Sequence, residues 1–299
     1  MVSSASMNGR VCLITGANSG IGKETALALA RMGATIIMVS RNAEKGEAAL
    51  TEIRQRTGND HVTLLVADLA SLNSVRRLAQ DFRDQHQGLH VLINNAGIFN
   101  SRRVLTDDGD ELTFAVNHLA HFLLTTLLLD LLKASAPSRI INVSSGAHSR
   151  AEINFDDLNA EAKYSGMSAY GQSKLANVLF TYELARRLEG TGVTANALHP
   201  GVVKTGFGRN SGGATGLLFR AFQTVASPFL LSADRGAETS IYLASSSEVD
   251  AVSGKYFVKK EPVQSSEASA DVAVAQKLWR VSEKLVGQLD VAPSGGARV

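Results

Sequence analysis

Tyr170 and Lys174 lie four residues apart in a segment with helical periodicity, so their side chains project from one face of the expected helix. A phenol, with an ordinary pKa of about 10, exchanges protons slowly at neutral pH. An ammonium about 4 Å away, at an effective dielectric constant near 20, contributes ~4 kcal/mol toward the phenolate, or ~3 pKa units. The pair predicts a tyrosine that acts as a general acid or base. Because the same spacing occurs on ordinary surface helices, this interpretation needs support from the surrounding residues.

Polar residues elsewhere in the chain supply that support. Val143-Ser144-Ser145 ends an apolar run, and a serine hydroxyl there could hydrogen-bond a substrate oxygen as charge develops on it. Asn117 lies in an apolar helical segment, where its amide needs a partner. It could hold a water or a backbone group that relays protons to Lys174. Ordinary turn and packing chemistry is the alternative for each of these residues.

A glycine-rich segment, Thr15-Gly16-Ala17-Asn18-Ser19-Gly20-Ile21-Gly22, connects the first apolar run to a helical one. Glycines there let the backbone approach a pyrophosphate, whose charge the helix N-terminus stabilises. A tight turn with close packing is the other interpretation, but the placement between a strand and a helix favours a dinucleotide. The residues expected to bind it are Gly16, Asn18, Ser19, Gly20, Ile21 and Gly22.

The residues after the later strands indicate which dinucleotide binds. Ser40-Arg41 follows the second run, where an NAD site usually carries an acid, and a guanidinium can instead grip a 2′-phosphate. We therefore expect NADP(H) rather than NAD(H), although Arg41 could also be a solvated surface arginine. Asp68-Leu69 is placed to meet the adenine, and Asn95-Ala96-Gly97 permits close approach of the backbone. In the turn that begins at His199, Val203 and Thr205 could fix the nicotinamide carboxamide.

Strands and helices alternate along the chain, which predicts a doubly wound, Rossmann-type parallel sheet of about seven strands with helices on both faces. Strands are expected at Val11 to Thr15, Thr35 to Ser40, Val62 to Ala67, Val91 to Asn94, Arg139 to Val143, Val193 to Leu198 and Gly254 to Val258. Helices are expected near 20–31, 44–57, 72–86, 110–133, 168–190 and 234–245. Ligands of such sheets bind beyond the carboxyl ends of the strands, where the residues above are found.

The composition is that of an ordinary soluble globular protein. The chain has 299 residues, of which 44% are hydrophobic and 19% charged, and its formal net charge is +2. Lys and Arg are dispersed among Asp and Glu, so we expect no nucleic-acid binding. The single cysteine, Cys12, excludes an internal disulfide and indicates a buried thiol in a reducing compartment. No targeting segment or membrane span is evident, and we expect a cytoplasmic protein.

No linker divides the chain, so we expect one domain over residues 1–299, with flexible ends at 1–8 and 290–299. Two long connections, 146–167 and 206–231, interrupt the alternation of strands and helices. The second carries several Phe and Leu residues among glycines and serines. It can be a surface helix, a lid over an apolar substrate, or an apolar foot in weak peripheral contact with a membrane.

Together, these motifs resemble the short-chain dehydrogenase/reductase family, and the resemblance extends from Val11 to about Leu289. It implies a nicotinamide-dependent oxidoreductase with a catalytic tetrad, in which Tyr170 is the acid–base group and Ser145 anchors the substrate oxygen. Lys174 would also bind the ribose, and Asn117 would support the proton relay. The family pattern points to the second of the two serines, and the interval from Ser145 to Tyr170 is longer than in most members.

Within that family the chain is most similar to the retinol dehydrogenase and WW-domain-containing oxidoreductase branch. The segments that carry the likeness are Gly16 to Ala26, Ser173 to Phe180, Ser253 to Phe257 and Lys277 to Trp279. It implies an NADP(H)-dependent enzyme for an apolar aldehyde, ketone or alcohol, such as a retinal-like, steroid-like or aliphatic compound. From the sequence we expect neither the N-terminal membrane anchor nor the WW modules of many members.

Two other functions and the oligomeric state stay open. Protochlorophyllide reductases look similar, but the cysteine expected near Lys174 in that group is missing. A redox sensor that holds NADP(H) without turnover is an alternative of another class, against which the intact Tyr170 and Lys174 argue. The helices that contain Leu119 to Leu132 and Tyr170 could pack on symmetry mates in a homodimer or homotetramer, or could belong to the core.

Overall fold

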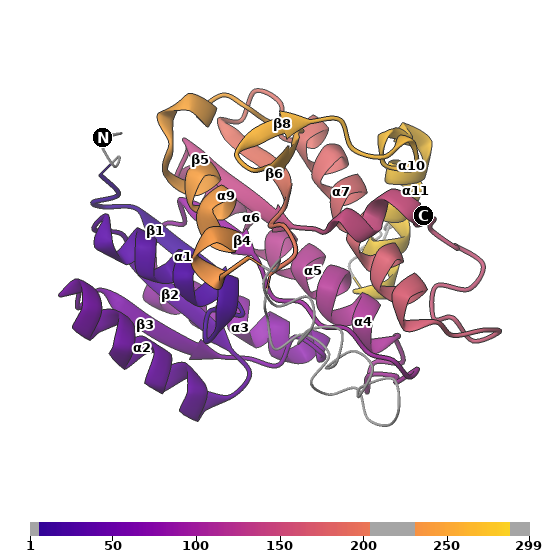
Figure 1. Ribbon diagram of the computed structural model, residues 1–299, viewed down its shortest axis with the longest axis horizontal. Helices are drawn as coiled ribbons and strands as arrows, with labels where there is room; N and C mark the ends of the chain where they lie inside the picture. Colours follow the sequence, from indigo (N-terminus) through magenta and orange to yellow (C-terminus); the bar gives the residue numbers. More distant parts are fainter. Residues whose placement is uncertain (1–5, 204–230, 288–299) are drawn as a thin grey trace, which may run out of the picture.

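The structure is a computed structural model that describes residues 6–203 and 231–287 (Figure 1). Its centre is an eight-stranded sheet in the order β3-β2-β1-β4-β5-β6-β7-β8. The strands are β1 (Val11–Thr15), β2 (Thr35–Ser40), β3 (Val62–Val66), β4 (Val91–Asn94), β5 (Ser138–Val143), β6 (Val193–His199), β7 (Tyr256–Val258) and β8 (Glu261–Val263). All neighbouring strands pair in parallel except β8, which is antiparallel to β7. The predicted doubly wound sheet is confirmed.

Helices cover both faces of this sheet. The α-helices are α1 (Gly20–Arg31), α2 (Ala43–Thr57), α3 (Leu72–Gln85), α4 (Leu112–Phe114), α5 (Ala120–Leu127), α6 (Leu129–Ala134), α7 (Gly166–Arg187), α9 (Ala233–Ser245), α10 (Glu267–Ala270) and α11 (Val272–Leu285). Shorter turns are the π-helical η1 (Ala115–Leu119) and the 3₁₀ segments η2 (Gly146–Arg150) and η4 (Ser247–Val249). In Figure 1, α1 and α9 lie side by side although they come from distant parts of the chain.

The apolar residues of the strands divide the core into two layers. Along β2, Ile37 and Val39 face a layer formed with α3, α5, α7 and α11. Ile36 and Met38 face the opposite layer, formed with α1, α2 and α9. Successive side chains of a strand point to opposite faces, so a continuous apolar run is what a strand with helices on both sides requires.

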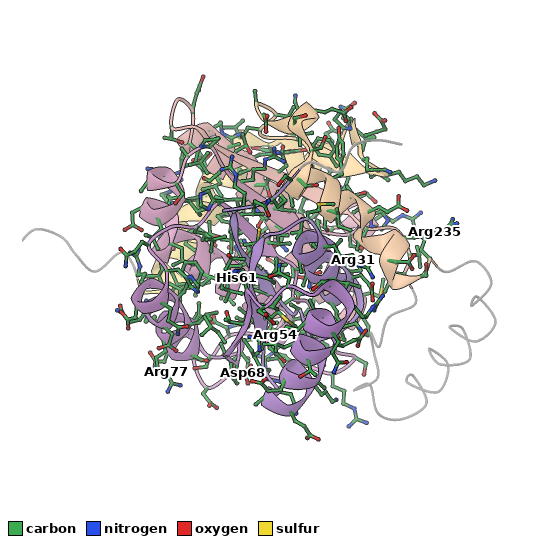
Figure 2. The ribbon with its side chains drawn as sticks, turned by 90° about the vertical axis from the view of Figure 1, so that its left-hand side faces the viewer. Arg31, Arg54, His61, Asp68, Arg77 and Arg235 are labelled. Carbon is green, nitrogen blue, oxygen red and sulfur yellow. The ribbon has the colours of Figure 1, made fainter. Side chains whose placement is uncertain are left out.

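The β3 edge of the sheet is fixed by side chains of the flanking helix. Figure 2 looks at this edge and shows Arg31, Arg54 and Arg77 on α1, α2 and α3. The Arg54 Nε and Nη2 atoms donate to the Val62 carbonyl at 3.1 and 2.7 Å, which ties α2 to the start of β3. The Asn42 side chain accepts from the Lys45 N–H and caps the same helix.

The long helix predicted near 110–133 is found from Leu112 to Ala134, but two irregular turns divide it. The first break is η1, where Asn117 is fully buried and its side chain bonds outside the helix. The second is at Leu128, which leaves helical geometry with φ −104° and ψ 6°. Just before it, the Thr126 hydroxyl donates to the Phe122 and Leu123 carbonyls, a contact that bends helices.

Three further elements correct the sequence-based prediction. The sheet has eight strands rather than about seven, because the exposed strand β8 pairs with β7 at the edge. Helices α10 and α11 are not among the predicted ones. Helix α11 packs on α7 and α5, where Trp279 lies 5.0 Å from the Phe122 ring and 5.7 Å from the Phe180 ring. One side of α5 and α7, two of the helices considered for contact with symmetry mates, therefore packs on the chain's own C-terminal part.

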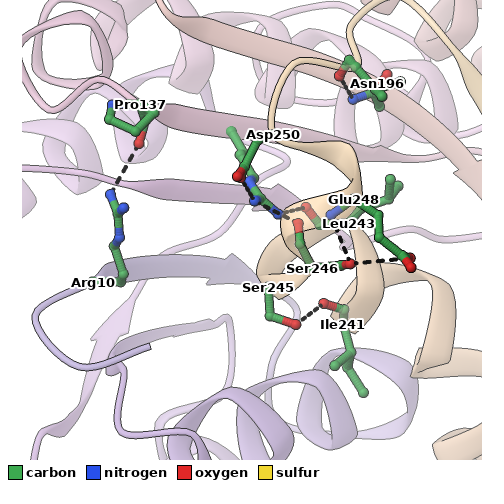
Figure 3. Close-up of polar contacts among 11 residues, drawn as sticks. Arg10, Pro137, Asn196, Ile241, Leu243, Ser245, Ser246, Glu248 and Asp250 are labelled. Carbon is green, nitrogen blue, oxygen red and sulfur yellow. Dashed lines mark hydrogen bonds and ion pairs between the residues drawn. The ribbon is translucent and has the colours of Figure 1, made fainter. Parts of the chain in front are cut away.

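A guanidinium fixes the C-terminus of α9. Arg139, on β5, donates to the Leu243 and Ser246 carbonyls at 2.8 Å each and pairs with Asp250 (Figure 3). The last carbonyls of a helix have no partner inside it, and a cation at this end also interacts favourably with the negative end of the helix dipole. Arg139 thus holds α9 against the sheet.

Parts of the terminal and loop predictions lie outside the described residues. These parts are residues 1–5, 206–230 and 290–299. Met7 is buried, and its N–H donates to the Met32 carbonyl, so the chain is fixed to the body within the segment expected to be flexible. Across the described ranges, no helix combines the length and the apolar character of a membrane-spanning segment.

Candidate active site

A cleft of about 1010 Å³ opens at the carboxyl ends of the strands. Its walls come from the glycine loop, from the segments after β2, β3, β4, β5 and β6, and from α7. Of the residues predicted to bind the cofactor, those that line the cleft are Gly16, Asn18, Ser19, Gly20, Ile21, Gly22, Arg41, Asp68, Leu69, Asn95, Ala96, Gly97, Tyr170, Lys174 and Val203. Thr205 lies outside the described residues.

Glycine is required at two places in the loop between β1 and α1. A Cβ on Gly22 would lie 2.4 Å from the Gly16 carbonyl oxygen and 2.5 Å from Asn95 Nδ2. Gly16 has φ +66°, and a Cβ there would approach the Ala96 Cα to 3.0 Å. The N-cap residue of α1, Ser19, makes no side-chain capping bond. The loop thus packs against the segment after β4 and leaves the helix N-terminus to bind an anion.

Thr15, at the end of β1, connects the glycine loop to the segment after β4. Its Oγ1 accepts from the Asn95 and Ala96 N–H groups at 2.9 and 3.0 Å. In return, Asn95 Nδ2 donates to the Thr15 carbonyl at 2.7 Å. These bonds hold two walls of the cleft at a fixed separation, as a rigid dinucleotide site requires.

The far end of the cleft carries the residues predicted to select the dinucleotide. Arg41 follows β2 and is exposed, so its guanidinium is accessible. Asp68, labelled in Figure 2, follows β3, and its Oδ1 accepts from the Ala70 N–H at 3.0 Å. Leu69 is buried beside it. The Arg41 guanidinium and the apolar Leu69 side chain therefore lie at the ends of β2 and β3, where the adenosine half of a dinucleotide is predicted to bind.

Ser145 and Tyr170 contact each other on the opposite side of the cleft. The Tyr170 hydroxyl and the Ser145 side chain are hydrogen-bonded. Ser145 Oγ also accepts from the Ala147 N–H at 3.2 Å. Ser144, by contrast, is buried, and its hydroxyl donates to the Lys174 carbonyl at 2.7 Å. The second serine is thus the one beside the tyrosine, whereas the first fastens β5 to α7.

Lys174 is buried directly behind Tyr170. Its side chain is 3% exposed, and Nζ donates to the Val143 carbonyl at 2.9 Å. Nζ lies 5.7 Å from the centroid of the Tyr170 ring. A Cβ on Gly97 would come within 3.3 Å of Nζ, so the glycine leaves the ammonium its space. Burial lowers the pKa of Lys174 to about 8, which leaves it charged at neutral pH.

The acidic tyrosine expected from the spacing is not found in the protein's own side chains. Burial raises the pKa of Tyr170 to about 12, and the hydrogen bond with Ser145 offsets only part of this effect. The helical spacing gives an ammonium about 4 Å from the phenol at an effective dielectric constant near 20, but it carries no information on the cost of burying a phenolate. In the structure, desolvation is the largest cause of the shift, and among the described residues the only opposing one is the bond with Ser145.

Asn117 does not line the cleft but supports it from behind. Its Oδ1 accepts from the Ile98 N–H at 2.8 Å, and its Nδ2 donates to the Ile98 carbonyl and to Ser173 Oγ. The amide therefore bonds backbone groups of the segment after β4, and its part in a proton relay to Lys174 stays a prediction. The residue lies in the π-helical turn η1, and π-bulges are frequent at functional sites.

Several residues near the tyrosine were not singled out from the sequence. Phe99 packs edge-on against the Tyr170 ring with centroids 6.1 Å apart. His148 and His199 contact the backbone next to Ser145. Further apolar side chains of the lining are Ile98, Leu112, Val116, Met167 and Val202. A histidine that closes a strand, as His199 does, is the one signal that could have been read from the sequence.

Comparisons with known proteins agree with this architecture. Two human proteins, retinol dehydrogenase 13 and retinol dehydrogenase 14, are 50% and 48% identical; each match covers 95% of this chain and 87% or 88% of theirs. A crystal structure of an uncharacterized protein from Mycobacterium paratuberculosis has TM-score 0.77 and 40% identity, covering 95% of this chain and 96% of that one.

A complex of RhlG from Pseudomonas aeruginosa with NADP is more distant, with TM-score 0.66 and 26% identity over 86% of this chain and 97% of that one. The expected likeness to retinol dehydrogenases is confirmed. The family described as short chain dehydrogenase matches residues 10–214, and this chain belongs to that family of oxidoreductases.

Proposed function

We propose that this protein is an NADP(H)-dependent reductase or dehydrogenase that interconverts an apolar aldehyde or ketone and the corresponding alcohol. The observation that carries the proposal is the meeting of the Ser145 and Tyr170 side chains, with Lys174 behind them, in the cleft that the glycine loop also lines. The human retinol dehydrogenases at about half identity support the reaction class.

The residues of the cleft fit a dinucleotide. The bare backbone at Gly16 and Gly22 and the uncapped start of α1 suit a pyrophosphate, and Arg41 suits a 2′-phosphate. NADP in the RhlG structure and NADPH in an Escherichia coli short chain dehydrogenase support the same choice. When bound, NADPH supplies the hydride that the carbonyl carbon accepts.

The protein's own side chains supply the proton that the substrate oxygen accepts and stabilise the charges that develop. Because its pKa is about 12, Tyr170 stays protonated at neutral pH and can donate its proton to the substrate oxygen. The Ser145 hydroxyl, already bonded to that phenol, holds the same oxygen as negative charge develops on it. Lys174 remains cationic and favours the phenolate left after transfer. Asn117 keeps the neighbouring backbone in place.

The lining beside Tyr170 favours an apolar substrate. Ile98, Phe99 and Met167 surround the opening near the tyrosine, and Met167 is 63% exposed. Most ligand sites combine such an apolar wall with few polar groups that fix orientation. Here the polar groups are Ser145 and Tyr170, so recognition of a single oxygen on an apolar body is what the described residues suit.

The test of the catalytic assignment is the loss of NADPH absorbance with a panel of retinal, steroid ketones and aliphatic aldehydes. We expect turnover by the wild-type protein and a loss of at least about a hundredfold in Tyr170→Phe, the scale of one general acid. The control is Tyr182→Phe, because that hydroxyl bonds Ser265 outside the cleft. Undiminished turnover in Tyr170→Phe would refute the role, and NADPH binding without turnover on any carbonyl would favour a sensor.

The cofactor assignment has a separate test. We expect NADPH to be preferred over NADH, and Arg41→Ala to weaken NADPH binding by about ten- to a hundredfold, as for loss of charge-assisted hydrogen bonds. NADH binding should hardly change. A wild-type protein that clearly prefers NADH would show that Arg41 does not select the cofactor.

A further inference from the structure

The peptide unit between Ser145 and Gly146 sits next to the substrate-binding hydroxyl. Two atoms of this unit can form hydrogen bonds, the Ser145 carbonyl oxygen and the Gly146 N–H. Each of them is bonded to the imidazole of a different histidine. The direction of the Ser145 side chain depends on this unit, because the peptide is planar and rigid.

His148 holds the carbonyl end. Its Nδ1 lies 2.7 Å from the Ser145 oxygen, which also accepts from the His148 backbone N–H at 3.2 Å. A carbonyl can only accept, so Nδ1 carries the proton. At the other side of the ring, Nε2 accepts from the Ser266 N–H at 3.2 Å. The ring is buried against Tyr256, with centroids 4.7 Å apart, so it has little freedom to turn.

His199 holds the amide end. It is the last residue of β6 and lines the cleft, and its Nδ1 accepts from the Gly146 N–H at 3.2 Å. An amide can only donate, so Nδ1 is unprotonated and the proton of the neutral ring is on Nε2. The two histidines are therefore opposite tautomers bound to one peptide unit.

We propose, on the basis of the function proposed above, that His148 and His199 are positioning residues that together fix the Ser145 hydroxyl for the substrate oxygen. A serine on a loop has several rotamers and needs a rigid backbone to be precise within a fraction of an ångström. Burial lowers the pKa of both histidines and so keeps them neutral, the state that the two bonds need.

The tautomers can be measured without any substrate. Nitrogen NMR of the ¹⁵N-histidine-labelled protein at pH 7.5 separates the two forms, and His148→Asn and His199→Asn assign the signals. We expect His148 to carry its proton on Nδ1 and His199 on Nε2. Equal tautomers, or rapid exchange between the two forms in either ring, would overturn the arrangement.

The action through Ser145 is tested by a double-mutant cycle. His199→Leu removes the acceptor of the Gly146 N–H, and we expect kcat to fall about tenfold, the loss of one hydrogen bond from the transition state. His199→Asn can place Oδ1 where Nδ1 was and should recover most of the rate. The matched control is the exposed His61, shown in Figure 2, as His61→Leu.

The decisive comparison uses the Ser145→Ala background. If His199 acts by positioning Ser145, His199→Leu should there change kcat by less than about twofold. An undiminished tenfold loss in that background, or no loss in the wild-type background, would overturn the proposal. A wild-type protein without turnover would instead refute the proposed function, and the tautomer measurement would still decide whether the two histidines hold the peptide.

Discussion

Loss of stability at mildly acidic pH should depend on His121, which is fully buried behind the cleft. Thr15 Oγ1 already accepts two backbone N–H groups, and of the two acceptors for its own proton, His121 Nε2 at 3.0 Å is closer than the Ile93 carbonyl at 3.4 Å. His121 Nδ1 donates to the Asn117 carbonyl at 3.1 Å. A second proton on this ring would face an oxygen with no acceptor position left. The ring thus joins the cofactor walls to the catalytic helix only when neutral.

The sign and size of the effect follow from the pKa. Burial, and next the Lys174 cation, lower the pKa of His121 from 6.5 to about 3. Between these values the unfolded state binds a proton that the folded state does not, so stability falls as the pH falls through this window. The slope is about 1.4 kcal/mol per pH unit, and the loss from pH 6.5 to 4.5 is about 2–3 kcal/mol.

Urea unfolding between pH 7.5 and 4.5 at constant ionic strength measures this slope, with Trp279, the single tryptophan, as the fluorescent reporter. His121→Gln should lower stability at pH 7.5 but flatten the slope below pH 6.5 by about 1.4 kcal/mol per unit. Asp110, whose pKa is raised to about 6, titrates in both the wild type and His121→Gln, so its contribution cancels in the difference between their slopes. The control is the exposed His61 as His61→Gln. Parallel curves for His121→Gln and wild type would refute the reasoning.

Three other substitutions have effects that the contacts define. Gly22→Ala should weaken NADPH binding at least tenfold and lower the free energy of unfolding by about 1–3 kcal/mol, because the added Cβ would lie 2.4 Å from the Gly16 carbonyl oxygen. An unchanged affinity in a fluorescence titration would contradict this. Trp279→Ala should lower the free energy of unfolding by about 3–5 kcal/mol, measured by circular dichroism, because the ring packs on Phe122. A loss below about 1 kcal/mol would mean that α11 contributes little to stability. Arg139→Met should lower the free energy of unfolding by about 2–3 kcal/mol and raise the rate of amide hydrogen exchange in α9 more than elsewhere. An equal rise in exchange throughout the protein would contradict a local role of Arg139 at α9.

Much of the fold could be predicted because local signals agree with the tertiary structure. The bounds of β1, β2 and β4 match the predicted ones, since each strand is an apolar run that ends at a polar or glycine-rich turn. β8 is different. Its three residues, Glu261–Val263, are exposed and contain a proline, so neither apolar alternation nor composition indicates a strand. Only pairing with β7 makes it one.

The candidate site divides in the same way. Spacing on a helix and position after a strand were sufficient to bring Tyr170, Ser145 and the glycine loop to one cleft. The two histidines that hold the Ser145 peptide come from η2 and from the end of β6, and no local pattern links them. Contacts that depend on which nitrogen carries a proton become visible only when the donors and acceptors around each ring are known.

The pKa of Tyr170 shows why spacing alone misjudged the chemistry. A lysine one helical turn away favours the phenolate, but the same packing that brings it close also removes water from the phenol. Lys174 meanwhile donates a hydrogen bond to the Val143 carbonyl, and its Nζ lies 5.7 Å from the centroid of the Tyr170 ring. A tyrosine with a raised pKa is present in its protonated form at neutral pH, although it is a weaker acid than a free tyrosine. For the function proposed above, this protonated form is the one with which reduction of a carbonyl begins, whereas oxidation of an alcohol begins with the phenolate.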